Sequence, residues 1–90
     1  MIHCKVIMER YYEVNICDTN LIGRKLNGTT INKHFYGEVM NKEEVKIHLR
    51  KATLINALGK ESVNLVREVK GELQVLNIEN IPYTQFYTIL

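Results

Sequence analysis

The 90-residue sequence contains no tryptophan, one proline and two cysteines, and it has no long apolar run. Its longest uncharged stretch, Asn80–Leu90, is too short to cross a bilayer as a helix, so no membrane partner is expected. Lys5, Glu9 and Arg10 interrupt the N-terminal segment in which a signal peptide would need apolar residues. These absences predict a soluble, cytoplasmic protein.

The two cysteines are not expected to form a disulfide. Apolar and polar residues alternate over 2–8 and 12–17, which is typical of half-buried strands. Keeping the two apolar faces together pairs Cys4 with Ile16, so Cys17 points to the opposite face of the sheet. Two free thiols fit a reducing cytosol.

Motifs for metal binding, phosphate binding and catalysis are also missing. The sequence has no C-x-x-C or H-x-x-H pair, its three histidines are scattered, and neither glycine-rich phosphate-binding pattern occurs. Cys17 stands beside Asp18, whose carboxylate disfavours the thiolate that a nucleophile needs. We therefore predict no cofactor, no metal site and no catalytic residue, and the sequence favours a non-enzymatic protein.

The formal charge is small but unevenly distributed. It is +2 overall, and residues 1–60 hold ten basic against six acidic side chains, whereas residues 61–90 hold two against four. Two interpretations remain open: a basic face on the first two thirds of the chain, or ordinary solvated helix and strand edges.

Ninety residues fit one domain, 1–90, with a single modest core. Asp18 is expected to cap a short helical turn, Asn27-Gly28 predicts a type I′ hairpin, and Asn41 and Gly59 are expected to begin and end a helix. The predicted elements are strands at 2–8 and 12–17, a helical turn at 19–22, hairpin strands near 24–26 and 29–33, a strand end and loop at 34–40, helices at 41–58 and 61–70, and strands at 73–78 and 84–90. The fold class is therefore α+β, with an antiparallel or mixed sheet and two helices packed on one face.

One amide stands where the helical pattern calls for an apolar side chain. Val45, Leu49, Ala52 and Asn56 recur at helical spacing and would form the core-facing stripe. A buried amide without partners costs about 1–3 kcal/mol, so Asn56 is expected to be buried and bonded to backbone groups of a neighbouring loop. One alternative is simple exposure of Asn56, which would follow if the helix broke near Lys51–Ala52. The other alternative is a polar ligand pocket. Its walls would be Asp18, Thr53, Asn56 and Gln85.

Cations and aromatic residues gather in the middle of the chain. Aromatic rings stack on unpaired bases while lysine and arginine contact phosphates, so this composition favours RNA binding. Against this, aromatic side chains more often lie in the core, and Phe35 and Tyr36 are compatible with that position too. The predicted RNA-binding residues are Arg24, Lys25, Lys33, Phe35, Tyr36, Arg50 and Lys51.

The C-terminal segment suggests a different kind of partner. Residues 84–90 are uncharged and rich in strand-forming side chains. As an edge strand, the segment could pair with a protein partner or with a second copy of the chain.

Four segments, ICDTNLIG, FYG, ATLINALG and IPYTQ, occur in an order that resembles an archaeal family known as domain of unknown function 424, over residues 11–90. Its characteristic positions match Asp18, Gly23, Phe35, Tyr36, Gly37, Ala52, Thr53, Asn56, Gly59, Pro82 and Gln85. The chain departs from the pattern at Glu38, Tyr83 and Thr84, where Gly, His and Ala are usual, and losing that His weakens any acid–base proposal. The resemblance implies a small archaeal protein without established enzymatic activity and with a link to translation. We accordingly expect an RNA- or ribosome-associated accessory factor.

Overall fold

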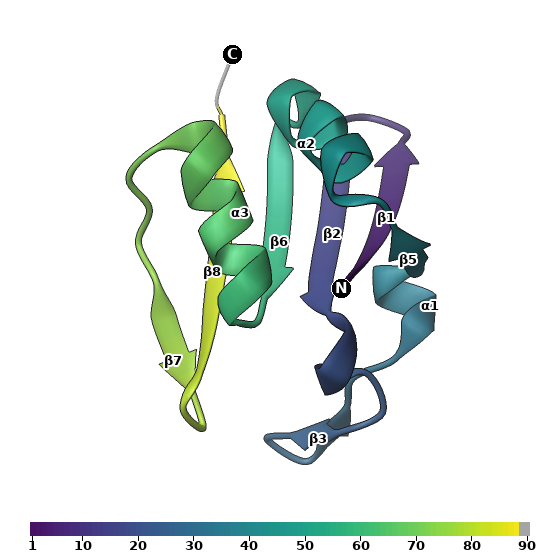
Figure 1. Ribbon diagram of the computed structural model, residues 1–90, viewed down its shortest axis with the longest axis vertical. Coiled ribbons are helices and arrows are strands. Elements are labelled where there is room, and N and C mark those ends of the chain that lie inside the picture. Colours follow the sequence, from purple (N-terminus) through teal and green to yellow (C-terminus); the bar gives the residue numbers. More distant parts are fainter. Residues whose placement is uncertain (89–90) are drawn as a thin grey trace.

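A mixed six-stranded sheet forms the centre of the computed structural model, which describes residues 1–88 (Figure 1). Its strand order is β5-β1-β2-β6-β8-β7, and every neighbouring pair is antiparallel except β2 and β6. The strands are β1 (Ile2–Met8), β2 (Tyr12–Asp18), β5 (Glu38–Met40), β6 (Leu54–Leu58), β7 (Leu76–Ile78) and β8 (Ile81–Tyr87). The predicted α+β class is confirmed.

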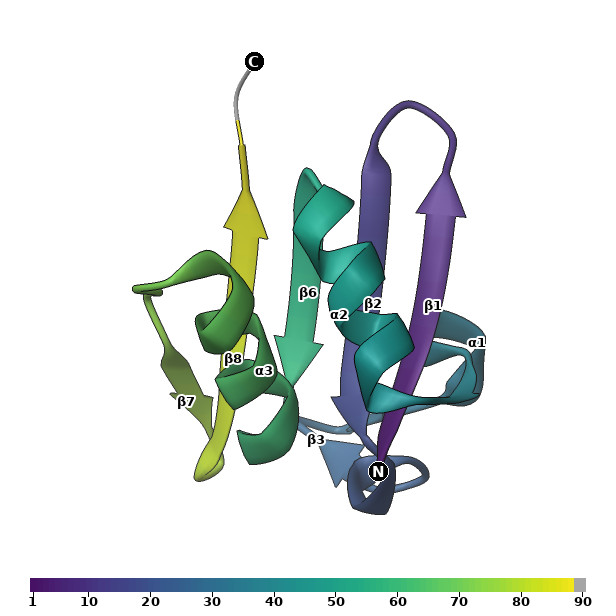
Figure 2. The same cartoon turned by 45° about the horizontal axis from the view of Figure 1, so that its top comes forward.

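Two long helices, α2 (Lys42–Lys51) and α3 (Lys60–Lys70), lie side by side on one face of the sheet (Figure 2). The main core lies between these helices and the sheet, and it includes Val14, Ile16, Ile55, Ala57, Leu49 and Val66. The single-turn helix α1 (Lys33–Tyr36) packs on β1 and β2. The hairpin of β3 (Lys25–Leu26) and β4 (Thr29–Thr30) follows the 3-10 turn η1 (Thr19–Leu21). A second cluster joins these parts to the other face of the sheet: Cys17, Leu21, Ile31, Tyr36 and Leu58.

The predicted pairing of the first two strands is confirmed. Cys4 lies opposite Ile16, Val6 opposite Val14, and Met8 opposite Tyr12. Both thiols are free and buried, one in each of the two clusters. The strands therefore hold their cysteines on opposite faces, as the alternation predicts.

The β3–β4 hairpin also forms where Asn27-Gly28 predicts it, with shorter strands. Asn27 has φ 51° and Gly28 has φ 78°, the positive values that a type I′ turn requires. The loop expected at 34–40 is wrong. Asn32 caps α1 by accepting from the Phe35 amide, and Gly37, at φ 73°, turns the chain into β5 where a Cβ would collide with the Cys4 carbonyl.

The helix predicted over 41–58 is wrong in its second half. Asn41 begins α2 as expected, accepting from the amides of Glu43 and Glu44, but α2 ends at Lys51 and β6 follows. The segment of β6 is apolar except for Asn56, and periodicity cannot distinguish so short a run from part of a buried helix. The second helix, predicted at 61–70, is α3.

The last two strands begin and end differently from the prediction. β7 covers only Leu76–Ile78, and Glu79 and Asn80, both at positive φ, form the turn into β8. β8 therefore starts at Ile81, earlier than expected. The end of the predicted segment 84–90, residues 89–90, lies outside the described residues.

Asp18 caps a different helix from the one predicted. It makes no side-chain bond in η1, and its carboxylate instead accepts from the amides of Glu61 and Ser62 at 3.0 and 2.7 Å and from the Ser62 hydroxyl at 2.7 Å. Gly59 does not end a helix but joins β6 to α3 at φ 109°, and a Cβ there would overlap the Asp18 carboxylate. This pair therefore fixes the start of α3 to the end of β2.

Candidate functional site

The sheet face opposite α2 and α3 is only partly covered. Val14 and Ile55 face the helices, so their neighbours along each strand face the other way. α1 and the β3–β4 hairpin cover one end of this side, through the second cluster. We call the remainder the open face, and it is formed by Lys5, Ile7, Glu13, Asn15, Leu54, Asn56, Tyr83, Gln85 and Tyr87.

Three amides cross the centre of the open face in one row. Asn15, Asn56 and Gln85 are direct partners on β2, β6 and β8. Gln85 Nε2 donates to Asn56 Oδ1 at 3.1 Å, and Asn56 Nδ2 donates to Asn15 Oδ1 at 2.8 Å. Asn15 Nδ2 then donates to the Glu13 carboxylate at 3.0 Å. We call these three residues the amide row.

Asn56 lies at the centre of the amide row, and its surroundings can be compared with the prediction. Asn56 is buried, with 8% of its surface exposed, and it is hydrogen-bonded, as predicted. The expectation of a backbone partner is wrong, because all its partners are side chains, including the Tyr83 hydroxyl at 3.1 Å. On a strand, the amide points out of the sheet toward its cross-strand neighbours rather than toward a loop.

The row has a direction and one accessible end. Every bond donates toward Glu13, so each amide polarises the next. Asn15 is wholly buried, whereas Gln85 is exposed, and within residues 1–88 its carbonyl oxygen accepts no hydrogen bond from the protein. Gln85 can therefore offer both an acceptor and a second N–H to a partner that lies on the open face.

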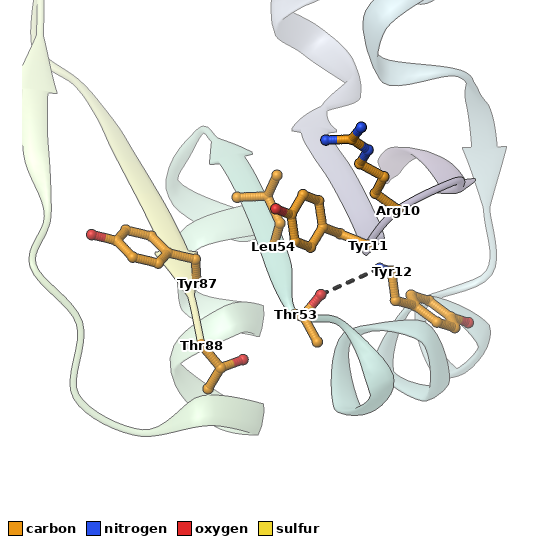
Figure 3. A pocket seen from close by; sticks show the side chains of 7 residues that line it. All are labelled: Arg10, Tyr11, Tyr12, Thr53, Leu54, Tyr87 and Thr88. Atoms are coloured by element: carbon orange, nitrogen blue, oxygen red, sulfur yellow. Dashed lines mark hydrogen bonds between the residues drawn. The ribbon is translucent and has the colours of Figure 1, made fainter. Parts of the chain in front are cut away.

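A pocket of about 600 Å³ adjoins the open face where the β1–β2 turn meets β6 and β8 (Figure 3). The Tyr12 amide donates to Thr53 Oγ1 at 3.2 Å, and the Thr53 amide donates to the Tyr12 carbonyl at 2.9 Å, so the wall between them is fixed. We call this the end pocket. It is lined by Arg10, Tyr11, Tyr12, Thr53, Leu54, Tyr87 and Thr88.

A smaller cavity of about 390 Å³ lies at the other end, between the β3–β4 hairpin, α1 and the sheet. Leu58 and Tyr83 line it from the sheet side and Leu26 from the hairpin. The rings of Phe35 and Tyr36 pack edge to face, with 4.8 Å between their centroids. Tyr36 is buried, and Phe35 is exposed at the rim. We call this the hairpin pocket. Tyr36 thus belongs to the core and Phe35 to the surface.

The sequence profile of the family described as "Protein of unknown function (DUF424)" matches residues 9–89. The chain belongs to this family. The resemblance noted in the sequence is therefore confirmed.

No curated protein gives a significant match to this DUF424 chain. Among solved structures, the crystal structure of an uncharacterized conserved protein from Methanopyrus kandleri is similar, with a TM-score of 0.79 and 19% identity. The match covers 96% of this chain and 90% of that chain. At this level of identity, the likeness shows a shared fold.

The residues predicted to bind RNA do not form one surface in this DUF424 protein. Arg24 and Lys25 are exposed at the β3–β4 hairpin, and Lys33 pairs with Glu38 at 3.0 Å. Arg50 and Lys51 end α2, at the opposite end of the molecule from the hairpin and on the helix-covered side (Figure 1).

The residues predicted to share one ligand pocket lie in three places. Asp18 bonds to the start of α3, Thr53 lines the end pocket, and only Asn56 and Gln85 contact each other. Sequence reasoning missed Arg10, Tyr11, Asn15 and Tyr87. The alternation over 12–17 places Asn15 on the polar side of its strand, and a strand at 54–58 would have brought it beside Asn56.

The described residues offer little for metal chemistry or for a thiol nucleophile. Residues 1–88 contain no group of three or more histidine, cysteine, aspartate or glutamate side chains that could hold a metal ion. Burial, followed by the charge of Glu44, raises the pKa of Cys4 to about 12. Burial and the charge of Asp18 raise the pKa of Cys17 to about 12 as well. In this part of the chain, no helix is long and apolar enough to cross a membrane.

Proposed function

We propose that this DUF424 protein binds single-stranded RNA on the open face and acts in the archaeal cytosol as an RNA- or ribosome-associated accessory factor. The observation that carries the proposal is the order of side chains along β8. Tyr83, Gln85 and Tyr87 follow each other on the open face, so an amide that can pair with a base edge stands beside the exposed ring of Tyr87, which can stack on a base. Tyr83, on the other side of Gln85, packs against the second cluster.

The amide row supports this role because it holds Gln85 in place. An exposed glutamine on its own loses rotamer entropy when it binds. Here Gln85 Nε2 is already bonded to Asn56, which is bonded to the wholly buried Asn15. The open face therefore presents a hydrogen-bonding group of fixed orientation, which favours recognition of a base edge.

Cations stand at both ends of the open face. Arg10 lines the end pocket, and Arg24 and Lys25 belong to the hairpin whose strands line the hairpin pocket. The carboxylate on the face, Glu13, accepts a bond from Asn15. A strand of RNA lying along β8 would thus have arginine or lysine near its phosphates at either end.

The test is fluorescence anisotropy with short single-stranded RNAs, using wild type and the Tyr87→Ala variant. Stacking on an aromatic ring contributes about 1–3 kcal/mol per base, so Tyr87→Ala should raise Kd about tenfold. Tyr87 is 63% exposed, so its removal leaves the core intact. Two to three neutralised phosphates predict a slope of log K against log salt of about −1.5 to −2.

The matched control is Arg67→Ala. It removes one exposed positive charge from α3, on the side of the sheet that the helices cover. It should leave the RNA affinity within about twofold, because charges separated by more than the Debye length of about 10 Å are screened at 0.1 M salt. Affinity that stays constant between low and high salt, or an equal loss in both variants, contradicts the proposal.

A second candidate, a protein partner or homodimer through the C-terminal strand, is favoured by one observation. Pro82 and Thr88 direct backbone groups toward β6, so the intervening Gln85 and Tyr87 direct theirs to the other side of β8. β7 pairs only with residues 81–83 there. This exposed edge can accept an added strand. Sedimentation of the RNA-free protein over a range of concentrations separates this candidate from RNA binding by a monomer.

A further inference from the structure

We infer that the end pocket takes the terminal nucleotide of a single-stranded RNA, with the base on Leu54 and the terminal phosphate on Arg10; this rests on the proposed RNA binding. The residues of the end pocket are not among those that sequence reasoning assigned to RNA. The end pocket thus gives the proposed RNA binding a terminal nucleotide as ligand, a direction of the RNA along β8 and a place on the molecule.

The pocket has the size and composition for one nucleotide. Its volume of about 600 Å³ lies within the usual range of small-molecule sites, about 300–1,000 Å³. Figure 3 shows the Leu54 side chain between the rings of Tyr11 and Tyr87, each 63% exposed. An apolar floor with an accessible aromatic ring on either side favours a flat heteroaromatic ring.

Arg10 supplies the anion-binding group. It stands in the β1–β2 turn at the rim of the pocket, and within the described part of the chain its guanidinium forms no salt bridge. A guanidinium binds phosphate oxygens through two parallel N–H bonds. A terminal phosphate carries close to two negative charges at neutral pH, so it is a stronger partner for Arg10 than an internal phosphodiester.

The position of the pocket favours an end over an internal nucleotide. On β8, Tyr83 and Gln85 lead along the open face to Tyr87, which lines the pocket. Beyond it stand the β1–β2 turn, with Arg10 and Tyr11, and Thr88 at the exit of β8. An RNA that follows β8 therefore meets the wall of the pocket where the sheet ends.

The experiment measures the affinity of one RNA sequence in four forms: 5′-phosphorylated, 3′-phosphorylated, with two hydroxyl ends, and circular. One phosphorylated form is expected to bind about five- to tenfold more tightly than the hydroxyl and circular forms, since hydrogen bonds between charged groups are strong and salt screens only part of their contribution. Whichever phosphorylated form binds more tightly gives the polarity of the RNA.

Two variants locate the effect. Arg10→Ala should abolish the preference for the phosphorylated end, and it should weaken binding of the phosphorylated form more than binding of the circular RNA. Arg24→Ala, a matched arginine at the other end of the open face, should weaken all four forms alike and keep the preference. Equal binding of all four RNAs to wild type overturns the end pocket while the open face stands. Absence of binding to every RNA overturns the proposed function itself.

Discussion

At the residue scale, the pairing of Gly59 with Asp18 joins the end of β2 to the start of α3. The carboxylate of Asp18 accepts three hydrogen bonds at the start of α3, from Glu61 and from Ser62. Those donors are at the helix N-terminus, where no intrahelical partner exists. Gly59 leaves the space that the carboxylate occupies.

Gly59→Ala should therefore be strongly destabilising. Overpacking costs about 1–3 kcal/mol and the left-handed backbone about 1–2 kcal/mol more, so we expect a loss of roughly 2–5 kcal/mol in the free energy of unfolding. Gly71→Ala is the matched control, because Gly71 also has positive φ but a Cβ there meets nothing within 4 Å. Gly71→Ala should reduce the free energy of unfolding by only about 1–2 kcal/mol.

Urea denaturation of the two glycine variants checks this prediction. Equal losses for Gly59→Ala and Gly71→Ala would show that only backbone strain acts. In an Asp18→Ala background the overlap is gone, so the additional cost of Gly59→Ala should fall to that of Gly71→Ala.

At the element scale, the sequence predicts the strands with one buried face and misses the one with two. The alternation over 2–8 and 12–17 gives both strands and their register correctly. The prediction of β6 fails because Leu54, Ile55, Ala57 and Leu58 are apolar on both faces of the strand, with Asn56 alone between them. No local signal separates such a run from a buried helix, so only the position of the neighbouring strands decides.

Because β6 is missed, only part of the site could be predicted from the sequence. The predicted ligand pocket contains both Asn56 and Gln85, and the structure bonds them to each other. The prediction also includes Asp18, because a sequence alone does not show which face of the sheet each residue occupies. The end pocket combines the β1–β2 turn with the ends of β6 and β8, a proximity that arises only once the sheet is assembled.

The amide row can be tested as a cooperative unit with leucine variants. Asn15→Leu and Asn56→Leu should each reduce stability by about 1–3 kcal/mol, since each leaves a buried amide without its partner. The double variant should cost clearly less than the sum, because replacing both partners by apolar groups leaves neither of the two amides unpaired. Chemical denaturation of the four proteins gives the coupling energy, and strictly additive losses would contradict a mutual bond.

At the scale of the whole molecule, the buried cysteine thiols and tyrosine hydroxyls make the stability of the fold sensitive to high pH. Burial raises the pKa of Cys4 and of Cys17 from 9.0 to about 12, and burial also raises the pKa of Tyr36 and Tyr83. Above pH 9 the unfolded chain therefore loses protons that the folded chain retains. Since the folded state binds more protons, stability must fall as the pH rises from about 9 to 12.

This pH dependence is measurable as the urea midpoint between pH 7 and pH 11. The wild-type midpoint should be flat near neutrality and decline above pH 9. A Cys4→Ala/Cys17→Ala variant, though less stable throughout, should decline less steeply, with the tyrosines accounting for what remains. Parallel curves for the two proteins would show that the thiols do not contribute.

The parallel pairing of β2 with β6 also has a consequence for the order of events during synthesis. Residues 19–53 separate the two strands, and a ribosome adding roughly 5–20 residues per second needs several seconds to make that connection. β6 therefore emerges from the ribosome later than β2 by the same interval, and until then the inner edge of β2 has no neighbour. A pause in translation before Leu54 would lengthen its exposure, so the yield of folded protein should depend on the elongation rate across this connection as well as on equilibrium stability.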